Sequence, residues 1–320
     1  MPRAFAVAAA ALLLAASPLA QAEDTLKLAI GQKGAWTTSM VDWGMRQDFF
    51  KAEGLDTQVF YTDGGAPTLQ AVISGSVDMA IDTGLLGVIG AYAKGAPLRV
   101  ISANTTGSDD TYWFVKADSG MKSIKDIAGK TIGYSQPGSS SNLETLALLE
   151  YFHVAAKPVA AGSITAGFTQ FMTGQLDVGW AVPPIGLKEL EEGKIIIIAR
   201  GNDVPAIRDE TVRVNLANKD VLEKRRDAVM RFMRAYERTI DWAYRSPEAI
   251  AYFAEANHVT EAIAKKSREE FFPRQMMQLY KIEGLDTALK QALDAKYISH
   301  PMIAADLAGL FQMVKPQAAK

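Results

Sequence analysis

Residues 61–102 constrain the fold more than any other part of this sequence. They contain two glycine turns, each leading into a short apolar helix, with a buried strand between the helices. The first turn, residues 63–66 (Asp-Gly-Gly-Ala), places Pro67 at the first helical position, where the missing N–H costs nothing. Because neither Gly65 nor Ala66 offers a capping oxygen, the free N–H groups of this helix are predicted to face a ligand. In α/β proteins, ligands bind at helix starts of this kind.

Apolar runs and turn residues predict the remaining elements. Strands are expected at residues 26–30, 57–61, 77–81, 98–102, 112–116, 130–135 and 195–199. Helices are expected at residues 39–52, 67–75, 123–128 and 302–314, together with one that ends at Phe152 and several after Asp220. This alternation predicts parallel pairing in doubly wound α/β sheets.

Two further patterns concern packing and symmetry. After residue 220, an apolar stripe at helical spacing predicts a core-facing helix surface. The stripe consists of Val229, Met233, Tyr236, Ile240 and Ala243. In addition, residues 169–180 repeat the order helix, glycine, aspartate and strand seen in the first half, so that Gly174 corresponds to Gly75 and Asp177 to Asp78. The repeat predicts two similar lobes that share one cleft.

Composition restricts the class of protein. The 320 residues include no cysteine, which excludes disulfides, thiolate metal sites and cysteine nucleophiles. A formal charge of −2 at pH 7 argues against a nucleic-acid-binding surface, because such surfaces are strongly basic. The length predicts roughly two domains.

The first 22 residues have the pattern of a secretory signal peptide. Arg3 supplies the positive charge, residues 4–16 form an apolar run, and residues 20–22 (Ala-Gln-Ala) match a cleavage site. The apolar run is too short to span a bilayer. We therefore expect cleavage after Ala22 and a soluble, periplasmic mature chain.

Several segments in a fixed order resemble one family. They are residues 51–56 (KAEGLD), 64–71 (GGAPTLQA), 74–78 (SGSVD), 94–97 (KGAP) and 123–133 (SIKDIAGKTIG). Together they resemble the periplasmic substrate-binding proteins of the nitrate/sulfonate/taurine ABC importers, a group that also includes binders of thiamine pyrimidine precursors. The resemblance covers nearly all of the mature chain, and the order of the segments makes it specific.

The resemblance implies a type II periplasmic binding protein with two α/β lobes, a two-segment hinge and a ligand cleft between the lobes. Lobe 1 would comprise residues 23–105 and 210–320, and lobe 2 residues 106–209, with crossings near residues 103–110 and 200–209. Such a protein closes on its ligand by a hinge motion and docks on a membrane permease. We expect a monomer that uses neither a cofactor nor a metal.

The first group of expected ligand-binding residues is Gly64, Gly65 and Thr68. Their helix start would offer N–H groups and a hydroxyl to an anion, and the matching turn of the family meets ligand. The alternative is a tight turn in which glycine supplies a positive φ.

The second group is Ser139, Ser140, Ser141 and Asn142, which stand at the start of a helix. They can present hydroxyl and N–H groups to an oxyanion, with about 0.3–1 kcal/mol from the helix dipole. The alternative is a capping box, since Ser141 and Glu144 stand at the S-x-x-E spacing. Glu144 would disfavour an anion unless it faces away from the site.

Trp36, beside Thr37, follows the first strand, where members of the family place an aromatic residue that covers the ligand. Trp180 occupies the corresponding turn of the second half. Either tryptophan could instead be a packing residue. Further candidates are Thr83, Gly84 and Asn104.

The charges of these loops leave two kinds of ligand open. The loops contain Lys33 but no arginine, so no bidentate clamp for a carboxylate or sulfonate is visible. They also contain four acidic residues, Asp63, Asp82, Asp109 and Asp110. A small oxyanion held by helix starts and hydroxyls is our first expectation. The alternative is a neutral or weakly basic, pyrimidine-like heteroaromatic that stacks on Trp36 or Trp180 and hydrogen-bonds to Asp63 or Asp82.

Nothing in the sequence predicts catalysis. His153, His258 and His300 lack metal-ligand spacing, and residues 138–141 lack the second glycine of a nucleophile elbow. Neither a P-loop nor a dinucleotide-binding glycine motif is present. Pyrimidine synthases with this fold use a cysteine-rich motif that this chain cannot have. An enzyme on the same fold remains the less favoured alternative to a receptor.

Overall fold

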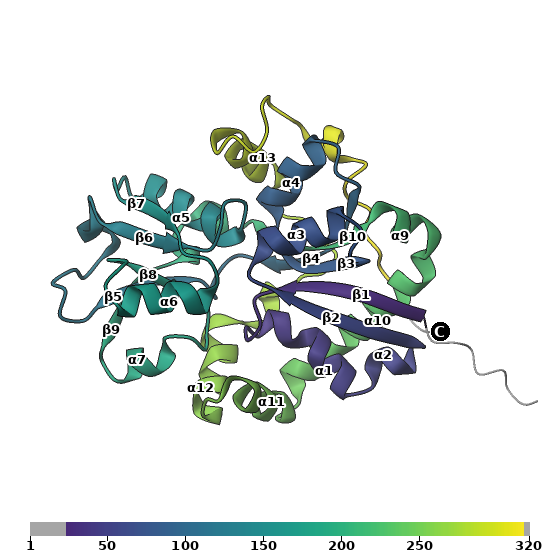
Figure 1. Cartoon of the computed structure of the whole chain (residues 1–320), viewed down its shortest axis with the longest axis horizontal. Coiled ribbons are helices and arrows are strands. Elements are labelled where there is room, and N and C mark those ends of the chain that lie inside the picture. Colours follow the sequence, from purple (N-terminus) through teal and green to yellow (C-terminus); the bar gives the residue numbers. More distant parts are fainter. Residues whose placement is uncertain (1–23, 317–320) are drawn as a thin grey trace, which may run out of the picture.

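The computed structural model describes residues 24–316, which form two α/β lobes lying side by side (Figure 1). The expected signal peptide, residues 1–22, lies outside the described residues. Within residues 24–316, no helix is both long and apolar enough to cross a membrane.

A five-stranded sheet with the order β2-β1-β3-β10-β4 forms the centre of the first lobe. Its strands are β1 (Asp24–Gly31), β2 (Leu55–Thr62), β3 (Met79–Gly84), β4 (Leu98–Thr106) and β10 (Thr211–Asn218). β1 pairs in parallel with β2 and β3, whereas β10 runs antiparallel between β3 and β4. Every residue of β10 is buried, because helices cover both faces of the sheet (Figure 1).

The helices of this lobe are α1 (Met40–Arg46), α2 (Phe49–Ala52), α3 (Gly65–Ile73), α4 (Leu85–Ala93), α9 (Lys219–Lys224), α10 (Arg226–Arg245), α11 (Glu248–Asn257), α12 (Glu261–Lys266) and α13 (Leu285–Asp294). α3 and α4 lie on one side of the sheet, and α1, α2 and α10 on the other (Figure 1). The apolar stripe of α10 is fully buried, which confirms that it faces the core.

The second lobe contains β5 (Tyr112–Lys116), β6 (Thr131–Tyr134), β7 (Lys157–Ala160), β8 (Gly179–Ala181) and β9 (Ile195–Arg200). Its helices are α5 (Ser140–Tyr151), α6 (Ile164–Met172), α7 (Leu187–Glu191) and, at the return crossing, α8 (Pro205–Arg208). β6 and β7 pair in parallel, but β5 pairs antiparallel with both β8 and β9. The α/β fold is confirmed, and the sheets are mixed rather than wholly parallel.

The two crossings between the lobes lie next to each other. The N–H of Gly107, after β4, donates to the carbonyl of Glu210, just before β10, at 2.8 Å. Strand pairing places β10 in the sheet of the first lobe, although the lobe boundaries at residues 105 and 210 stay a prediction.

The repeated aspartates occupy equivalent places in the two lobes. The carboxylate of Asp78 accepts from the N–H of Lys27 at the start of β1, at 2.8 Å. The carboxylate of Asp177 accepts from the N–H of Thr131 at the start of β6, at 2.9 Å. Each aspartate therefore fixes the first strand of its lobe, which is a structural role.

Three predictions of elements were wrong in detail. The helix expected over residues 39–52 breaks at Asp48, whose φ of 55° interrupts it between α1 and α2. α3 begins at Gly65, so that Pro67 is its third residue rather than its first. The helix expected over residues 302–314 is a single 3-10 turn, Ala304–Leu307. The chain beyond that turn runs along β4, where the N–H of Gln312 donates to Val100 at 2.9 Å, because an edge strand leaves its hydrogen-bonding groups free.

Candidate functional site

A small cavity of about 50 Å³ lies between the lobes. The first lobe contributes the end of β1, the start of α3, the end of β3 and one side chain of β10 to its walls. The second lobe contributes the start of α5, β8 and the start of α6. Several elements thus end at one place, as expected of α/β folds, in which ligands bind at strand ends and helix starts.

Some of the predicted site residues line this cavity and others do not. Those that line it are Thr37, Gly65, Gly84, Ser139, Ser140, Ser141 and Trp180. Those that do not are Trp36, Gly64, Thr68, Thr83 and Asn104. For the lining residues, contact with a solute stays a prediction.

Trp36 belongs to the core of the first lobe. It is fully buried, with its ring centroid 4.7 Å from that of Trp43 and 5.3 Å from that of Phe253. These contacts describe packing, the alternative that the sequence left open. Trp180, in contrast, lines the cavity from β8, directly opposite Trp113 of β5.

Gly64 and Thr68 shape the turn rather than the cavity wall. Gly64 has a φ of 127°, a conformation that glycine adopts readily. The hydroxyl of Thr68 donates to the carbonyl of Gly64 at 2.8 Å and lies 2.6 Å from the hydroxyl of Thr62. Gly65, the first residue of α3, is the part of this turn that reaches the cavity, and no side chain caps this helix.

The three serines at the start of α5 all line the cavity, but their hydroxyl groups make different hydrogen bonds. Ser139 is the N-cap, since its hydroxyl accepts from the N–H of Asn142 at 3.2 Å. Ser141 accepts instead from the N–H of Ser135 at 3.0 Å, so the alternative that the sequence left open, a capping box between Ser141 and Glu144, does not form. The hydroxyl of Ser140 accepts a hydrogen bond from across the cleft.

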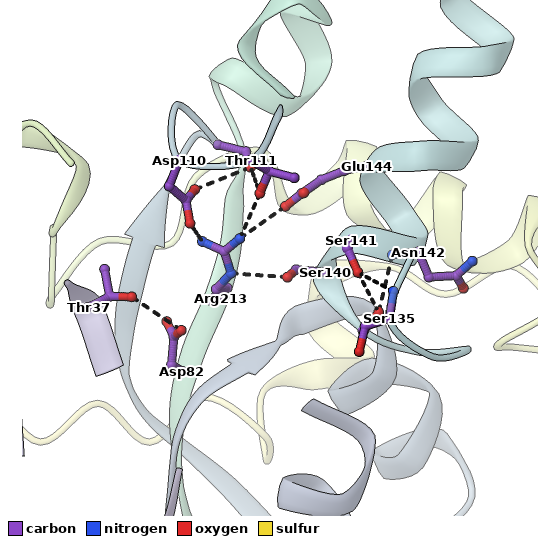
Figure 2. A network of polar contacts seen from close by, with 12 residues as sticks. Thr37, Asp82, Asp110, Thr111, Ser135, Ser140, Ser141, Asn142, Glu144 and Arg213 are labelled. Atoms are coloured by element: carbon purple, nitrogen blue, oxygen red, sulfur yellow. Dashed lines mark hydrogen bonds and ion pairs between the residues drawn. The ribbon is translucent and has the colours of Figure 1, made fainter. Parts of the chain in front are cut away.

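The donor of that bond is Arg213, which sequence reasoning missed. It lies on β10, points into the cleft, and its Nε donates to Ser140 at 3.0 Å (Figure 2). Its Nη1 donates to Asp110 at 2.8 Å, and its Nη2 lies 3.4 Å from Glu144. Arg213 thus joins the first lobe, a crossing and the second lobe. A charged residue inside the apolar run of residues 211–217 was the signal that could have revealed it.

Asp82 is a second acidic group of the cavity. Its carboxylate accepts from the amide of Asn104. It also accepts from the hydroxyl of Thr37 at 3.4 Å (Figure 2). Asn104 therefore supports the cavity from behind. Thr83, the neighbour of Asp82 on β3, is buried with its hydroxyl unpaired, and it does not line the cavity.

Acidic groups outnumber basic ones here. Burial raises the pKa of both Asp82 and Glu144, and Arg213 opposes that rise. Burial alone would lower the pKa of Arg213, but the nearby carboxylates of Asp110, Glu144 and Asp82 outweigh it and keep the guanidinium charged. The site therefore combines one permanent cation with three carboxyl groups.

Close glycine contacts join the two lobes beside the cavity. A methyl group added to Gly84 would lie 2.8 Å from the backbone nitrogen of Ser140, and one added to Gly87 would lie 2.6 Å from the carbonyl oxygen of Gly138. The amide of Gln32 also donates across the cleft to the hydroxyl of Ser135 at 3.2 Å. The described conformation is therefore one in which the lobes touch.

A family model described as NMT1/THI5 like matches residues 43–250. Among curated relatives, a protein of Brucella abortus (strain 2308) named as a binding protein is 26% identical over 224 residues, which cover 67% of this chain and 65% of the relative. A 4-amino-5-hydroxymethyl-2-methylpyrimidine phosphate synthase of Aspergillus parasiticus is 24% identical over 213 residues, which cover 63% of this chain and 61% of that enzyme. The chain thus spans less than two thirds of the length of these relatives.

Solved structures resemble the chain over nearly its whole length. The periplasmic aliphatic sulphonate-binding protein SsuA from Escherichia coli has a TM-score of 0.72 at 16% identity and covers 93% of this chain and 94% of its own. SsuA from Xanthomonas axonopodis pv. citri, bound to MOPS, has a TM-score of 0.73 at 15% identity, with 88% and 96% covered. The nitrate-binding protein NrtA from Synechocystis PCC 6803 has a TM-score of 0.70 at 12% identity, with 90% and 86% covered. These likenesses establish the fold of periplasmic binding proteins.

Proposed function

Because the chain belongs to the NMT1/THI5-like family and has the fold of periplasmic binding proteins, we propose that it is the solute receptor of an ABC importer. It binds a small molecule between its lobes in the periplasm, as a monomer, and delivers the molecule unchanged to a membrane permease. Neither a cofactor nor a metal takes part.

One observation carries this proposal. The interlobe cavity takes its walls from helix starts and strand ends of both lobes, and its polar groups come from both sides. A solute that enters it would replace interactions that now run directly between the lobes, such as the bond from Gln32 to Ser135. Solute binding and lobe closure are coupled by that arrangement.

Two solute classes follow from the neighbours. A sulfonate- or nitrate-like oxyanion is supported by the names of the structural neighbours and by the uncapped start of α3. A pyrimidine-like heteroaromatic is supported by the named activity of the Aspergillus parasiticus relative and by Trp180 at the cavity.

An enzyme on the same fold is the alternative from another class. It is favoured by the relatives named as synthases. Asp110 and Glu144 pair with Arg213, and Asp82 already accepts from Asn104 and Thr37, so each carboxyl group of the cavity has structural partners. The receptor proposal accounts for this arrangement with fewer assumptions.

A thermal-shift panel on the mature protein tests the receptor role. A true ligand at 100 times its dissociation constant should raise the stability by about 2.7 kcal/mol. Mass spectrometry should then recover the ligand unchanged. Conversion of the solute by the pure protein would contradict the proposal.

A cavity-filling variant provides the matched control. At Gly65 an added Cβ has its nearest neighbours at 3.8 Å, so Gly65→Leu can place a side chain in the cavity without backbone strain. This variant should stay folded and lose the thermal shift. Ser74→Leu, at the exposed end of the same helix, should keep it.

A further inference from the structure

The one guanidinium that the described structure places at the cavity is already engaged at all three of its nitrogens. A guanidinium has five N–H donors. The Nε of Arg213 donates to Ser140, its Nη1 to Asp110, and its Nη2 to both Thr111 and Glu144. No adjacent pair of N–H groups remains, so Arg213 cannot grip an anion in the bidentate way that favours carboxylates and sulfonates.

Asp82, by contrast, faces the cavity with spare capacity. Within residues 24–316, no cation lies within 4 Å of its carboxylate oxygens. Its neighbour Asn104 is held in one orientation, because the carbonyl oxygen of that amide accepts from Tyr236 at 2.9 Å and from Asn215 at 3.4 Å. The amide nitrogen is thereby directed at Asp82, and the carboxylate keeps a fixed position with free lone pairs.

A second, separate acceptor also lacks a donor. Gln32 lines the cavity, and its amide nitrogen donates across the cleft to Ser135. Its amide oxygen is buried without any hydrogen-bond partner. A buried polar atom without a partner is unfavourable, so a ligand that donates a hydrogen bond to this oxygen would remove that cost.

We infer that the solute presents a protonated or readily protonated nitrogen, of the kind found in amidines and guanidines, whose N–H groups donate to Asp82 and to the amide oxygen of Gln32. This inference rests on the proposed function, because it concerns the same cavity. The uncapped N–H groups at the start of α3 donate to a neutral oxygen or ring nitrogen of the same solute. The oxyanion that the sequence favoured is thus replaced by a solute of opposite charge.

Calorimetric titration with isosteric probes of opposite charge tests the inference. Acetamidinium is compared with acetate, and benzamidinium with benzoate. The wild-type protein should bind the amidinium of each pair about tenfold more tightly or better, a difference of about 1.4 kcal/mol. This comparison needs no variant and therefore does not depend on folding of an altered chain.

Two variants assign the preference to a residue. Asp82→Asn keeps an oxygen that accepts from Asn104 and removes the charge, so it should weaken amidinium binding by about 30-fold, as expected when one partner of a buried charge pair is removed. Asp63→Asn, a change of the same kind in a loop outside the cavity lining, should leave the affinity unchanged.

Three results would overturn the inference. They are tighter binding of the carboxylate probe, binding of neither member of either pair, and an unaltered amidinium affinity in the Asp82→Asn variant. Tight binding of an anion would leave the receptor role intact and reject only the solute class. Conversion of a probe would reject the receptor role itself.

Discussion

Arg213 concentrates several interactions in a single buried side chain. Its guanidinium meets Asp110 and Glu144, whose side chains have 2% and 0% of their surface exposed. Buried ion pairs contribute little net stability, but removal of one partner leaves an uncompensated charge. Arg213 therefore matters for stability because it pairs with these two buried carboxylates.

Replacement of Arg213 by methionine should lower the free energy of unfolding by about 3–5 kcal/mol, because both carboxylates lose their partner in a buried place. Urea denaturation measures this change. The matched control is Arg46→Met, which breaks a pair with Glu255 that is largely exposed to solvent, and should have little effect. Equal losses in both variants would show that the buried network has no special role.

Glu210 predicts a pH dependence of stability. It is fully buried, and burial raises its pKa from 4.5 to about 8, although the neighbouring amide of Gln291 opposes the rise. Because the folded-state pKa is raised, the stabilising contribution is complete below pH 4.5 and is lost as the pH rises through 8. Glu210→Gln should remove this loss.

Unfolding free energies measured from pH 4 to pH 9 test the assignment. At the alkaline end Glu210→Gln should exceed the wild type by a few kcal/mol, since each pKa unit corresponds to about 1.4 kcal/mol. Glu261→Gln, at an exposed position, serves as the control and should follow the wild-type curve. A wild-type curve without any decline over this range would contradict the raised pKa.

At the residue level, the sequence predicted the turns of the site better than its charges. Gly65, Gly84 and Ser140 follow from local turn and helix-start patterns, and all three line the cavity. Arg213 could not be placed in the same way, because its position depends on β10 pairing with two strands more than 100 residues earlier in the chain. Trp36 follows the first strand, where a ligand-covering aromatic residue was expected, but its side chain is buried in the core.

At the level of elements, the starts of α4 and α5 approach through glycine. The α4 residue Gly87 lies so close to Gly138 that an added methyl group would be 2.6 Å from a carbonyl oxygen. That oxygen belongs to the backbone, which cannot rotate away as a flexible side chain can. The two helix starts can approach this closely only while position 87 remains glycine.

Gly87→Ala should therefore hinder closure. Alanine favours a helix over glycine by about 1 kcal/mol, so the first lobe itself should not be destabilised. Solute affinity should nevertheless fall by about tenfold or more, because the closed form becomes strained. Calorimetric titration with the solute found by the ligand panel measures this loss. Ala91→Ser, on the same helix but away from this contact, should bind the solute as the wild type does. If Gly87→Ala also bound the solute with wild-type affinity, the closure argument would be contradicted.

The sequence predicted most elements because each carries a local signal. β10 is the exception. Its eight buried residues lie between two helical regions, and they carry no turn signal that separates them from a helix. The terminal segment failed for a related reason. Leu307, Leu310 and Val314 are buried at spacings that suit a helix, yet the carbonyl of Leu310 and the N–H of Val314 hydrogen-bond to β4.

At the level of the whole molecule, the proposal requires motion of one lobe relative to the other. The chain contains no cysteine, so two introduced cysteines can be labelled without a background. Met45 in the first lobe and Met172 in the second are 40% and 38% exposed and suit such labels. Spin labels at Met45→Cys and Met172→Cys should show a shorter, narrower distance distribution when solute is added.

The same labels in the Gly87→Ala background serve as the control, because a chain that cannot close should keep the longer distances. A distribution that is identical with and without saturating solute would contradict hinge closure. The overall fold was predictable from the ordered family segments, whereas the extent of closure was not, since it depends on contacts such as Gln32 with Ser135 that join distant parts of the chain.

The position of Arg213 has a consequence for engineering. The side chain that ties the lobes together grows from a central sheet strand, whereas Gly65, Thr37 and Trp180, at the cavity wall, come from other elements. To redesign this scaffold for a new cargo, for instance as a biosensor, the wall positions can therefore be varied while Arg213 is left unchanged.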